Sequence, residues 1–257
     1  MAFFVLTPQA VSIPVRSEAK FSSSPPGPAA PSPWDDPRSV DRAQESLRRG
    51  GMVVLVDGDS GHADLIAAGS SITAELVNAM AVHGRGLPYL ALSAARIDWL
   101  RLPPMASSWS LYRKPFTVSI EARDGVTTGI SAADRARTIR VATSPHAEPA
   151  DLVSPGHVFP LRARSDESPR AFGRVEAALA LVKEAGAFEG AAMTEILDEA
   201  GAMASPAYAS ALSARMGLPV VGVGVVTARF QGPPPSRVAP PPRTHAMPSV
   251  GEGAPCL

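Results

Sequence analysis

Three aspartates and one histidine follow a short apolar run in the first third of the chain. The run MVVLV (52–56) suits one buried strand, and the stretch LVDGDSGHADLI (55–66) continues from it. It places Asp57, Asp59, His62 and Asp64 in one short loop. Carboxylates and imidazoles bind divalent metals and transfer protons in catalysis. The pattern therefore indicates a metal site or an acid/base site.

Two later segments also combine polar side chains with turn-forming residues. DGVTTGISAADR (124–135) is rich in Gly, Thr and Ser, so its hydroxyls and backbone N–H groups could bind an anion. The alternative is a tight turn before a capped helix. SPGHVFPLRAR (154–164) places His157 after Pro-Gly, with Arg162 and Arg164 nearby. An isolated histidine is more often an ordinary core or surface residue than a ligand.

Helical and extended patterns alternate around these segments. Apolar spacing and the capping residues Ser39, Thr73 and Ser205 predict four helices, within 39–49, 74–82, 169–186 and 205–217. Runs of apolar or alternating residues predict four strands, at 52–56, 115–122, 191–197 and 219–226. The segment 138–143 fits a strand or the end of a helix. The alternation predicts a single layered α+β (α/β) domain over residues 39–228.

Composition limits the possible partners. The 257 residues carry a formal net charge of +0, which gives no basic surface field for nucleic acid. No apolar run reaches the length of a membrane span, so we expect a cytoplasmic protein with no membrane partner. The single cysteine, Cys256, cannot form an intrachain disulfide. Proline-rich stretches predict disordered tails at 1–38 and 229–257.

Taken together, the polar segments resemble the 3,4-dihydroxy-2-butanone 4-phosphate synthase family of the riboflavin pathway. The matching motifs are FTVSIEARDGVTTGISAADRARTIR (116–140) and PGHVFPLRA (155–163). Weaker matches extend the resemblance over about residues 39–226, through SVDRAQESLRRGGMVVLVD, RLPPM, VEAALALVKEAG and EILDEAGAMA. Long motifs in the same order and at the right separation make the resemblance specific.

The resemblance implies a layered α+β fold, usually a homodimer with active sites at the subunit interface. Enzymes of this family convert the small molecule ribulose 5-phosphate to dihydroxybutanone phosphate and formate, using Mg²⁺ or Mn²⁺. Matching positions imply that His157 binds the metal and that Asp64, His157 and Glu176 are catalytic. They also imply that four residues of the hydroxyl-rich segment bind substrate, namely Thr128, Ser131, Asp134 and Arg135.

Departures from the family pattern lie where substrate and metal are expected. The acidic loop is two residues shorter, and Ser60 stands at the position of a metal-binding Glu. Ser154 replaces an Arg, while Arg174 and Val175 replace the His and Thr of a Gly-His-Thr-Glu motif. The usual Cys of the strand after the second helix is missing from GLPYLAL (86–92).

New groups could compensate for these losses. Arg113, Lys114 and Arg174 add positive charge that could bind an anionic substrate in another way. Asp57 or His62 could join His157 in a metal site, a set better suited to a transition metal than to Mg²⁺.

Three interpretations follow. The first is a divergent enzyme that performs enolisation, elimination or C–C cleavage on a different carbonyl substrate in specialised biosynthesis. The second is an authentic dihydroxybutanone phosphate synthase with a compensated site, and the third is a non-catalytic binding or regulatory homologue. Fold resemblance alone does not choose among them, because function depends on the site.

Overall fold

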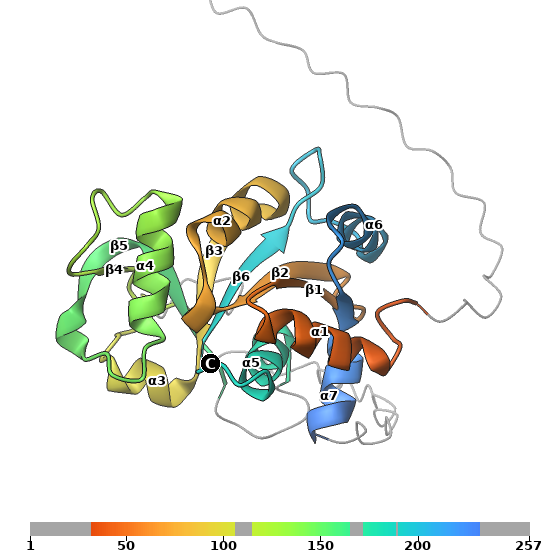
Figure 1. The fold of residues 1–257 in the computed structure, drawn as a ribbon, viewed down its shortest axis with the longest axis horizontal. Coiled ribbons are helices and arrows are strands. Elements are labelled where there is room, and N and C mark those ends of the chain that lie inside the picture. The colour runs from red at the N-terminus through yellow and green to blue at the C-terminus, as the bar shows by residue number, and fades with distance from the viewer. Residues whose placement is uncertain (1–31, 106–114, 165–171, 189, 232–257) are drawn as a thin grey trace, which may run out of the picture. The chain divides into compact units, whose positions relative to one another are not determined.

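The computed structural model describes residues 32–105, 115–164, 172–188 and 190–231 (Figure 1). Its strands are β1 (Met52–Asp57), β2 (His62–Ala68), β3 (Arg85–Leu92), β4 (Ile120–Ala122), β5 (Leu152–Arg162), β6 (Ala191–Ile196) and β7 (Val220–Gly222). They form one mixed sheet in the order β4-β5-β3-β6-β2-β1-β7. β1 is parallel to β7 and β3 to β5, whereas β2 and β6 are antiparallel to each of their neighbours.

Helices cover both faces of this sheet (Figure 1). The helices that pack on one face are α1 (Arg38–Arg48), α5 (Arg174–Glu184) and α7 (Val223–Gln231). Those on the other are α2 (Ala74–Ala79), α3 (Ala94–Trp99), α4 (Ala132–Ala142) and α6 (Pro206–Met216). Short 3-10 turns at Gly69–Ser71 and Pro149–Asp151 and a π-helical turn at Met80–Gly84 complete the described helices. The prediction of a layered α/β domain is confirmed.

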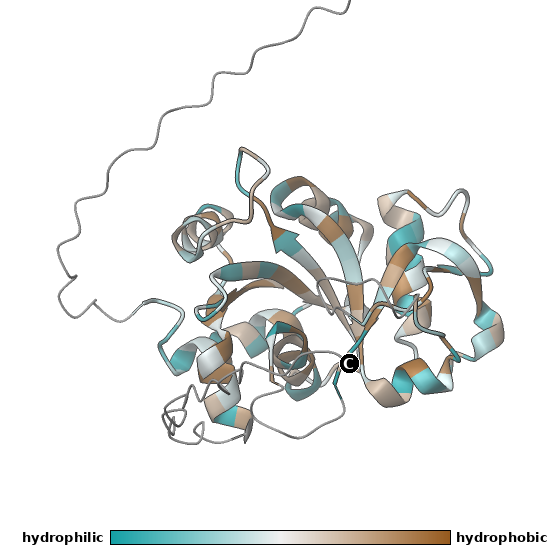
Figure 2. Cartoon of the chain, turned by 180° about the vertical axis from the view of Figure 1, so that it is seen from behind, coloured by the Kyte–Doolittle hydropathy of each residue, from teal (hydrophilic) through white to brown (hydrophobic). Residues whose placement is uncertain are grey.

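The strand β1 explains why the run 52–56 is apolar at every position. Val53 and Leu55 pack in the core under α1, α5 and α7, while Val54 and Val56 pack in the core of the opposite face. All four side chains are fully buried. A strand that is covered on both faces needs apolar residues throughout. The covering helices carry hydrophobic and hydrophilic residues side by side, as Figure 2 shows.

Two of the three predicted helix caps are confirmed. The Thr73 hydroxyl accepts a hydrogen bond from the backbone N–H of Leu76 (3.3 Å), and that of Ser205 accepts one from Tyr208 (3.2 Å). The prediction for Ser39 is wrong, because α1 already begins at Arg38 and Ser39 is fully buried in its first turn. Its hydroxyl lies 3.5 Å from Trp34 O.

The predicted strand at 219–226 is wrong beyond Gly222. β7 ends there, and the remaining valines begin α7, with Val223 and Val226 buried in one core. A short valine-rich run fits a buried strand or a buried helix, and periodicity alone does not separate them. The strand predicted at 115–122 is regular only over β4, and the segment 138–143 is the end of α4.

The folded part extends slightly beyond 39–228. Trp34 O accepts a hydrogen bond from Gly222 N (2.8 Å), which ties residues before α1 to the end of β7. Residues 1–31 and 232–257, where the Pro-rich tails are predicted, lie outside the described residues. None of the helices in the described ranges is long and apolar enough to cross a membrane.

Candidate active site

Asp64 lies in a buried polar cluster with Tyr89, Arg174 and Glu195, here called the Asp64 cluster. Arg174 Nη1 donates to Asp64 Oδ2 at 2.6 Å, and Tyr89 Oη donates to Asp64 Oδ1 at 3.0 Å. Arg174 Nη2 also lies 3.4 Å from Glu195 Oε1. Asp64 and Glu195 face each other across β2 and β6, and Arg174 reaches them from the first turn of α5. The cluster therefore joins residues from four elements of the fold.

Burial dominates the electrostatics of this cluster. Asp64 is 0% exposed, and this burial raises the pKa of its carboxyl, although the Arg174 guanidinium opposes the shift. Burial likewise raises the pKa of the Tyr89 hydroxyl, so it donates as a neutral phenol. A buried carboxylate without a cation would be very costly. The charge of Arg174 is thus offset by two carboxylates inside the protein.

Glu176 binds backbone N–H groups at the start of α5. Its Oε2 accepts from Gly173 N and its Oε1 from Arg164 N, both at 3.0 Å. The first contact satisfies one of the free N–H groups at a helix N-terminus. The second ties the chain after β5 to α5. Glu176 therefore links the segment after β5, the strand of His157, to the start of α5, the helix of Arg174.

The acidic loop closes on itself. Asp57 Oδ1 accepts from Asp59 N (3.1 Å) and Ser60 N (3.3 Å), and Asp57 Oδ2 accepts from the Ser60 hydroxyl (2.7 Å). His62 lies opposite Asp57 across the β1–β2 hairpin. In the part of the chain that the structure describes, no group of three or more His, Cys, Asp or Glu side chains is arranged to hold a metal ion.

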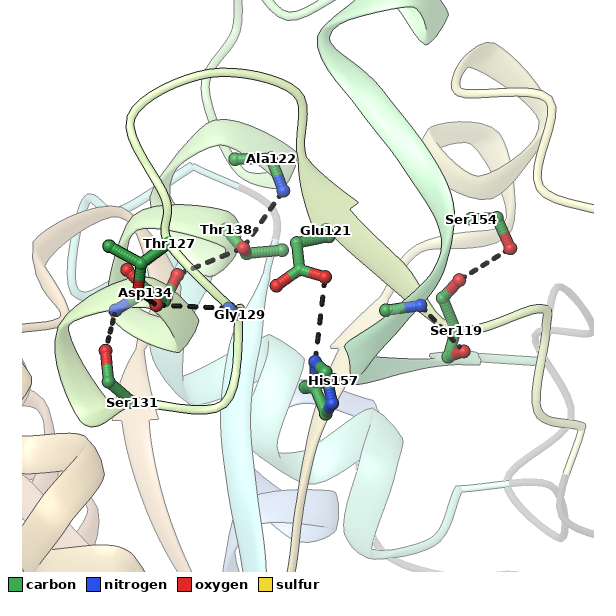
Figure 3. A network of polar contacts seen from close by, with 11 residues as sticks. Ser119, Glu121, Ala122, Thr127, Gly129, Ser131, Asp134, Thr138, Ser154 and His157 are labelled. Atoms are coloured by element: carbon green, nitrogen blue, oxygen red, sulfur yellow. Dashed lines mark hydrogen bonds and ion pairs between the residues drawn. The ribbon is translucent and has the colours of Figure 1, made fainter.

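His157 lies beside Glu121, and these two residues are called the His157 pair (Figure 3). His157 Nδ1 is 3.6 Å from Glu121 Oε2. The histidine is on β5 and the glutamate on the neighbouring β4. The Glu121 side chain is 13% exposed and that of His157 is 44% exposed. The imidazole of this pair is therefore open to solvent, whereas its carboxylate is largely buried.

The hydroxyl-rich segment forms a fixed loop next to this pair (Figure 3). Asp134 Oδ2 accepts from the Thr127 hydroxyl (2.8 Å) and from Gly129 N (3.1 Å). The Ser131 hydroxyl caps α4 by accepting from Asp134 N (3.0 Å). Asp134 and Ser131 thus shape the loop, while Thr128 is exposed at its surface.

The predicted cationic residues differ in their surroundings. Arg135 is partly buried, which lowers the pKa of its guanidinium, and within the described chain its buried Nε has no hydrogen-bond partner. Arg113 and Lys114 lie outside the described residues. Arg174 is held by Asp64 and Glu195 as described above.

The Asp64 cluster and the His157 pair lie on the same face of the sheet but apart from each other. On β2, Asp64 points to the same face of the sheet as Ile66 and to the opposite face from Leu65. The strands β3 and β6 lie between β2 and β5, the strand that carries His157. Three strand spacings correspond to about 14 Å. A single chain therefore does not bring His157 together with Asp64, nor with Asp57 and His62 at the same hairpin.

The layered α/β domain thus carries two groups of ionisable side chains, the Asp64 cluster and the His157 pair. Residues 41–228 match the family model of 3,4-dihydroxy-2-butanone 4-phosphate synthase. The chain is 40% identical over 185 residues to the synthase of Pseudomonas aeruginosa, covering 71% of this chain and 51% of that protein. It is 39% identical over 195 residues to the synthase of Bordetella pertussis, covering 75% and 85% respectively.

Solved structures agree with these relatives. A 3,4-dihydroxy-2-butanone 4-phosphate synthase in complex with two magnesium ions matches with a TM-score of 0.71 and 32% identity, covering 75% of this chain and 98% of that one. A two-domain synthase from A. baumannii matches with a TM-score of 0.68 and 36% identity, covering 73% and 56%. The chain thus spans about half the length of some relatives and nearly all of others. It belongs to the 3,4-dihydroxy-2-butanone 4-phosphate synthase family.

Three residues of these groups were missed by sequence reasoning. Glu121 lies inside the longest matching motif, but an alternating strand pattern gave it no special role. Tyr89 lies in the segment from which the family's Cys is missing, and Glu195 lies in a predicted strand. Only contacts between distant residues distinguish these side chains from ordinary strand residues.

Proposed function

We propose that the protein is a lyase of its family's type, which converts ribulose 5-phosphate to dihydroxybutanone phosphate and formate in riboflavin biosynthesis. The observation that carries the proposal is the hydroxyl-rich loop, whose sequence is the longest family match and which lies folded beside the His157 pair. Relatives that carry this name are about 40% identical to the chain. On this proposal, other residues take over the role of the metal-binding Glu whose position Ser60 occupies in the acidic loop.

The reaction needs groups that move protons next to a carbonyl. A proton is removed to give an enediol, water leaves, the carbon skeleton rearranges and formate is lost. Carboxylates and imidazole are suitable acids and bases when they reach the substrate. His157 is accessible for this role, and Glu176 lies at the start of α5 close to Arg174. Thr128 and Arg135 offer a hydroxyl and a cation to an anionic substrate.

A divalent cation fits the chemistry of the His157 pair. Mg²⁺ keeps several waters and commonly takes only one or two protein ligands in addition to substrate oxygens. The imidazole of His157 is a suitable donor, and its partner Glu121 is the kind of carboxylate that orients metal-binding histidines. When bound, Mg²⁺ or Mn²⁺ stabilises negative charge on the substrate oxygens.

A second copy of the chain would complete the site. Because β3 and β6 separate the two groups in one chain, His157 can approach Asp64 or the acidic loop only across an interface. This arrangement favours the homodimer that the family resemblance implies. It also leaves room for Asp57 or His62 of one copy to join His157 of the other. We expect this dimer to work in the cytoplasm.

The Asp64 cluster favours a second candidate function. Both oxygens of Asp64 accept hydrogen bonds, one from Arg174 and one from Tyr89. These donors lie in segments that depart from the family pattern. A proton-transferring Asp64 would have to leave these donors, so a divergent lyase acting on another carbonyl substrate in specialised biosynthesis is the alternative. A non-catalytic homologue is the third.

One assay separates these candidates. The purified protein is incubated with ribulose 5-phosphate and Mg²⁺ or Mn²⁺, and formate is measured with and without EDTA. We expect formate release that EDTA abolishes and that His157→Ala lowers by about 10²–10⁴-fold. Asp98→Asn changes an exposed carboxylate on α3 and is the matched control, with no expected loss.

Absence of formate would overturn the first candidate. In that case, exchange of deuterium from solvent into a panel of hydroxyketone phosphates detects proton removal without the later steps. Exchange that depends on His157 would support the divergent lyase. A protein that neither releases formate nor catalyses exchange, yet binds one of these compounds in calorimetry, would be a binding homologue.

A further inference from the structure

Glu121 lies within ion-pair distance of His157, and the family resemblance gives Glu121 no role. Its Oε2 lies 3.6 Å from His157 Nδ1, which is an ion-pair distance rather than a hydrogen bond. Figure 3 shows the Nδ1 atom of His157 directed toward this carboxylate, whose side chain is 13% exposed while that of His157 is 44% exposed. Nδ1 is therefore the ring nitrogen that lies beside the carboxylate.

The position of the Glu121 carboxylate is fixed by the hydroxyl-rich loop. A Cβ atom at Gly129 would lie 1.0 Å from Glu121 Oε1, so a larger residue there would displace the carboxylate from this position. Gly129 also has φ +80°, a conformation that favours glycine. Asp134 holds this loop through Gly129 N. Among the described residues, Glu121 Oε1 is buried without a hydrogen-bond partner.

The backbone of His157 is fixed from the other side. Gly156 N donates to the Ser119 hydroxyl (3.1 Å), and the Ser154 hydroxyl donates to Ser119 O (2.7 Å). A side chain at Gly156 would collide with Ile120 O, because its Cβ would lie 2.1 Å away. Close approach of β5 to β4 thus sets where the imidazole stands relative to the carboxylate of Glu121.

We infer that Glu121 is a positioning residue, which orients the His157 imidazole and keeps its proton on Nδ1 so that Nε2 is free to bind. A carboxylate next to one ring nitrogen stabilises an N–H there and leaves the lone pair on the other nitrogen. The lone pair of Nε2 on this partly exposed side chain can then bind a metal ion or accept a hydrogen bond from a substrate hydroxyl. This inference deepens the proposed function, since it rests on His157 as the binding residue.

Nitrogen NMR tests the inference without any turnover. The protein is labelled with ¹⁵N-histidine, and the five histidines are separated by comparison with His157→Gln. At a pH where the ring is neutral, the unaltered protein should carry the proton of His157 on Nδ1. Glu121→Leu should shift it toward Nε2, and Glu121→Gln, which keeps an acceptor oxygen, should retain the Nδ1 form. An Nε2 proton in the unaltered protein would overturn the inference even if no variant folds.

Mn²⁺ binding, followed by the EPR signal of free Mn²⁺, is the second readout. We expect Glu121→Leu to weaken binding by about 10- to 100-fold, as for other partners of metal-binding histidines, and Glu121→Gln to weaken it less. Asp124→Asn alters an exposed carboxylate in the same segment and is the matched control. Unchanged Mn²⁺ affinity in folded Glu121→Leu would contradict the inference.

The two proposals fail in different ways. If ribulose 5-phosphate gives no formate but the proton moves in Glu121→Leu, the positioning role stands and only the substrate assignment falls. If formate is released and Glu121→Leu changes neither the proton nor the ratio of KM to kcat, the reaction stands and the positioning role falls.

Discussion

The Asp64 cluster and the His157 pair both join a carboxylate to a nitrogen-bearing side chain, but in opposite surroundings. Asp64 is 0% exposed and lies 2.6 Å from Arg174. His157 is 44% exposed and lies 3.6 Å from Glu121. The first group is closed by its own hydrogen bonds, whereas the second leaves one face to solvent. Only the second can take a ligand without first breaking a buried ion pair.

The difference separates groups that the family pattern treats alike. The family resemblance predicts catalytic roles for both Asp64 and His157, yet Asp64 is bound to Arg174 and Tyr89 within its own chain. Breaking a buried pair is costly because it leaves an uncompensated charge. Mutations should therefore affect mainly stability in the Asp64 cluster, and mainly ligand binding in the His157 pair.

The largest effect is expected from Arg174→Met. Removal of the guanidinium leaves Asp64 buried without a cation, so the free energy of unfolding should fall by about 3–5 kcal/mol in urea denaturation. Arg162→Met is the control, because Arg162 pairs with the exposed Asp98 and should cost at most about 1 kcal/mol. Equal losses in the two variants would show that burial does not distinguish the pairs. The double change Asp64→Leu with Arg174→Met should recover most of the stability.

Tyr89→Phe should have a smaller effect on the same cluster. It removes the hydroxyl that donates to Asp64 and keeps the ring, which packs edge-on against Phe116. A hydrogen bond to a charged group contributes about 1.5–3 kcal/mol, and the urea midpoint should fall accordingly. Tyr208→Phe on α6 removes a hydroxyl from a partly exposed ring and serves as the control. No difference between the two would mean that the Asp64–Tyr89 contact is dispensable.

The smallest effect concerns pH and the loop beside the His157 pair. The Thr127 hydroxyl lowers the pKa of Asp134, with further hydrogen bonds from Ser131 and from Gly129 N in the same direction. A lowered folded-state pKa gives stability that is present above the unfolded value of about 3.9 and is lost as pH falls through the folded value. Urea midpoints between pH 6 and pH 2.5 should therefore drop more steeply for the unaltered protein than for Asp134→Asn. Asp124→Asn should follow the unaltered curve, and parallel curves for all three would contradict this account.

Much of the fold followed from local patterns. The run 52–56 predicts β1, Thr73 and Ser205 mark where α2 and α6 begin, and the long motifs identify the family. Each of these features depends on a few consecutive residues, so it is visible in the sequence. The wrong strand prediction also had a local cause. The valine run after Gly222 fits a strand by its residue types, but it folds as α7.

The sequence by itself determined the family, the layered fold and the segments that carry His157, Asp64 and Glu176. Only the tertiary structure decided which side chains meet. Arg174 contacts Asp64 although 110 positions separate them, because α5 begins over the strand that carries Asp64. Glu121 meets His157 because β4 and β5 are paired. Strand order and register are set by packing of the whole core, and no local pattern encodes them.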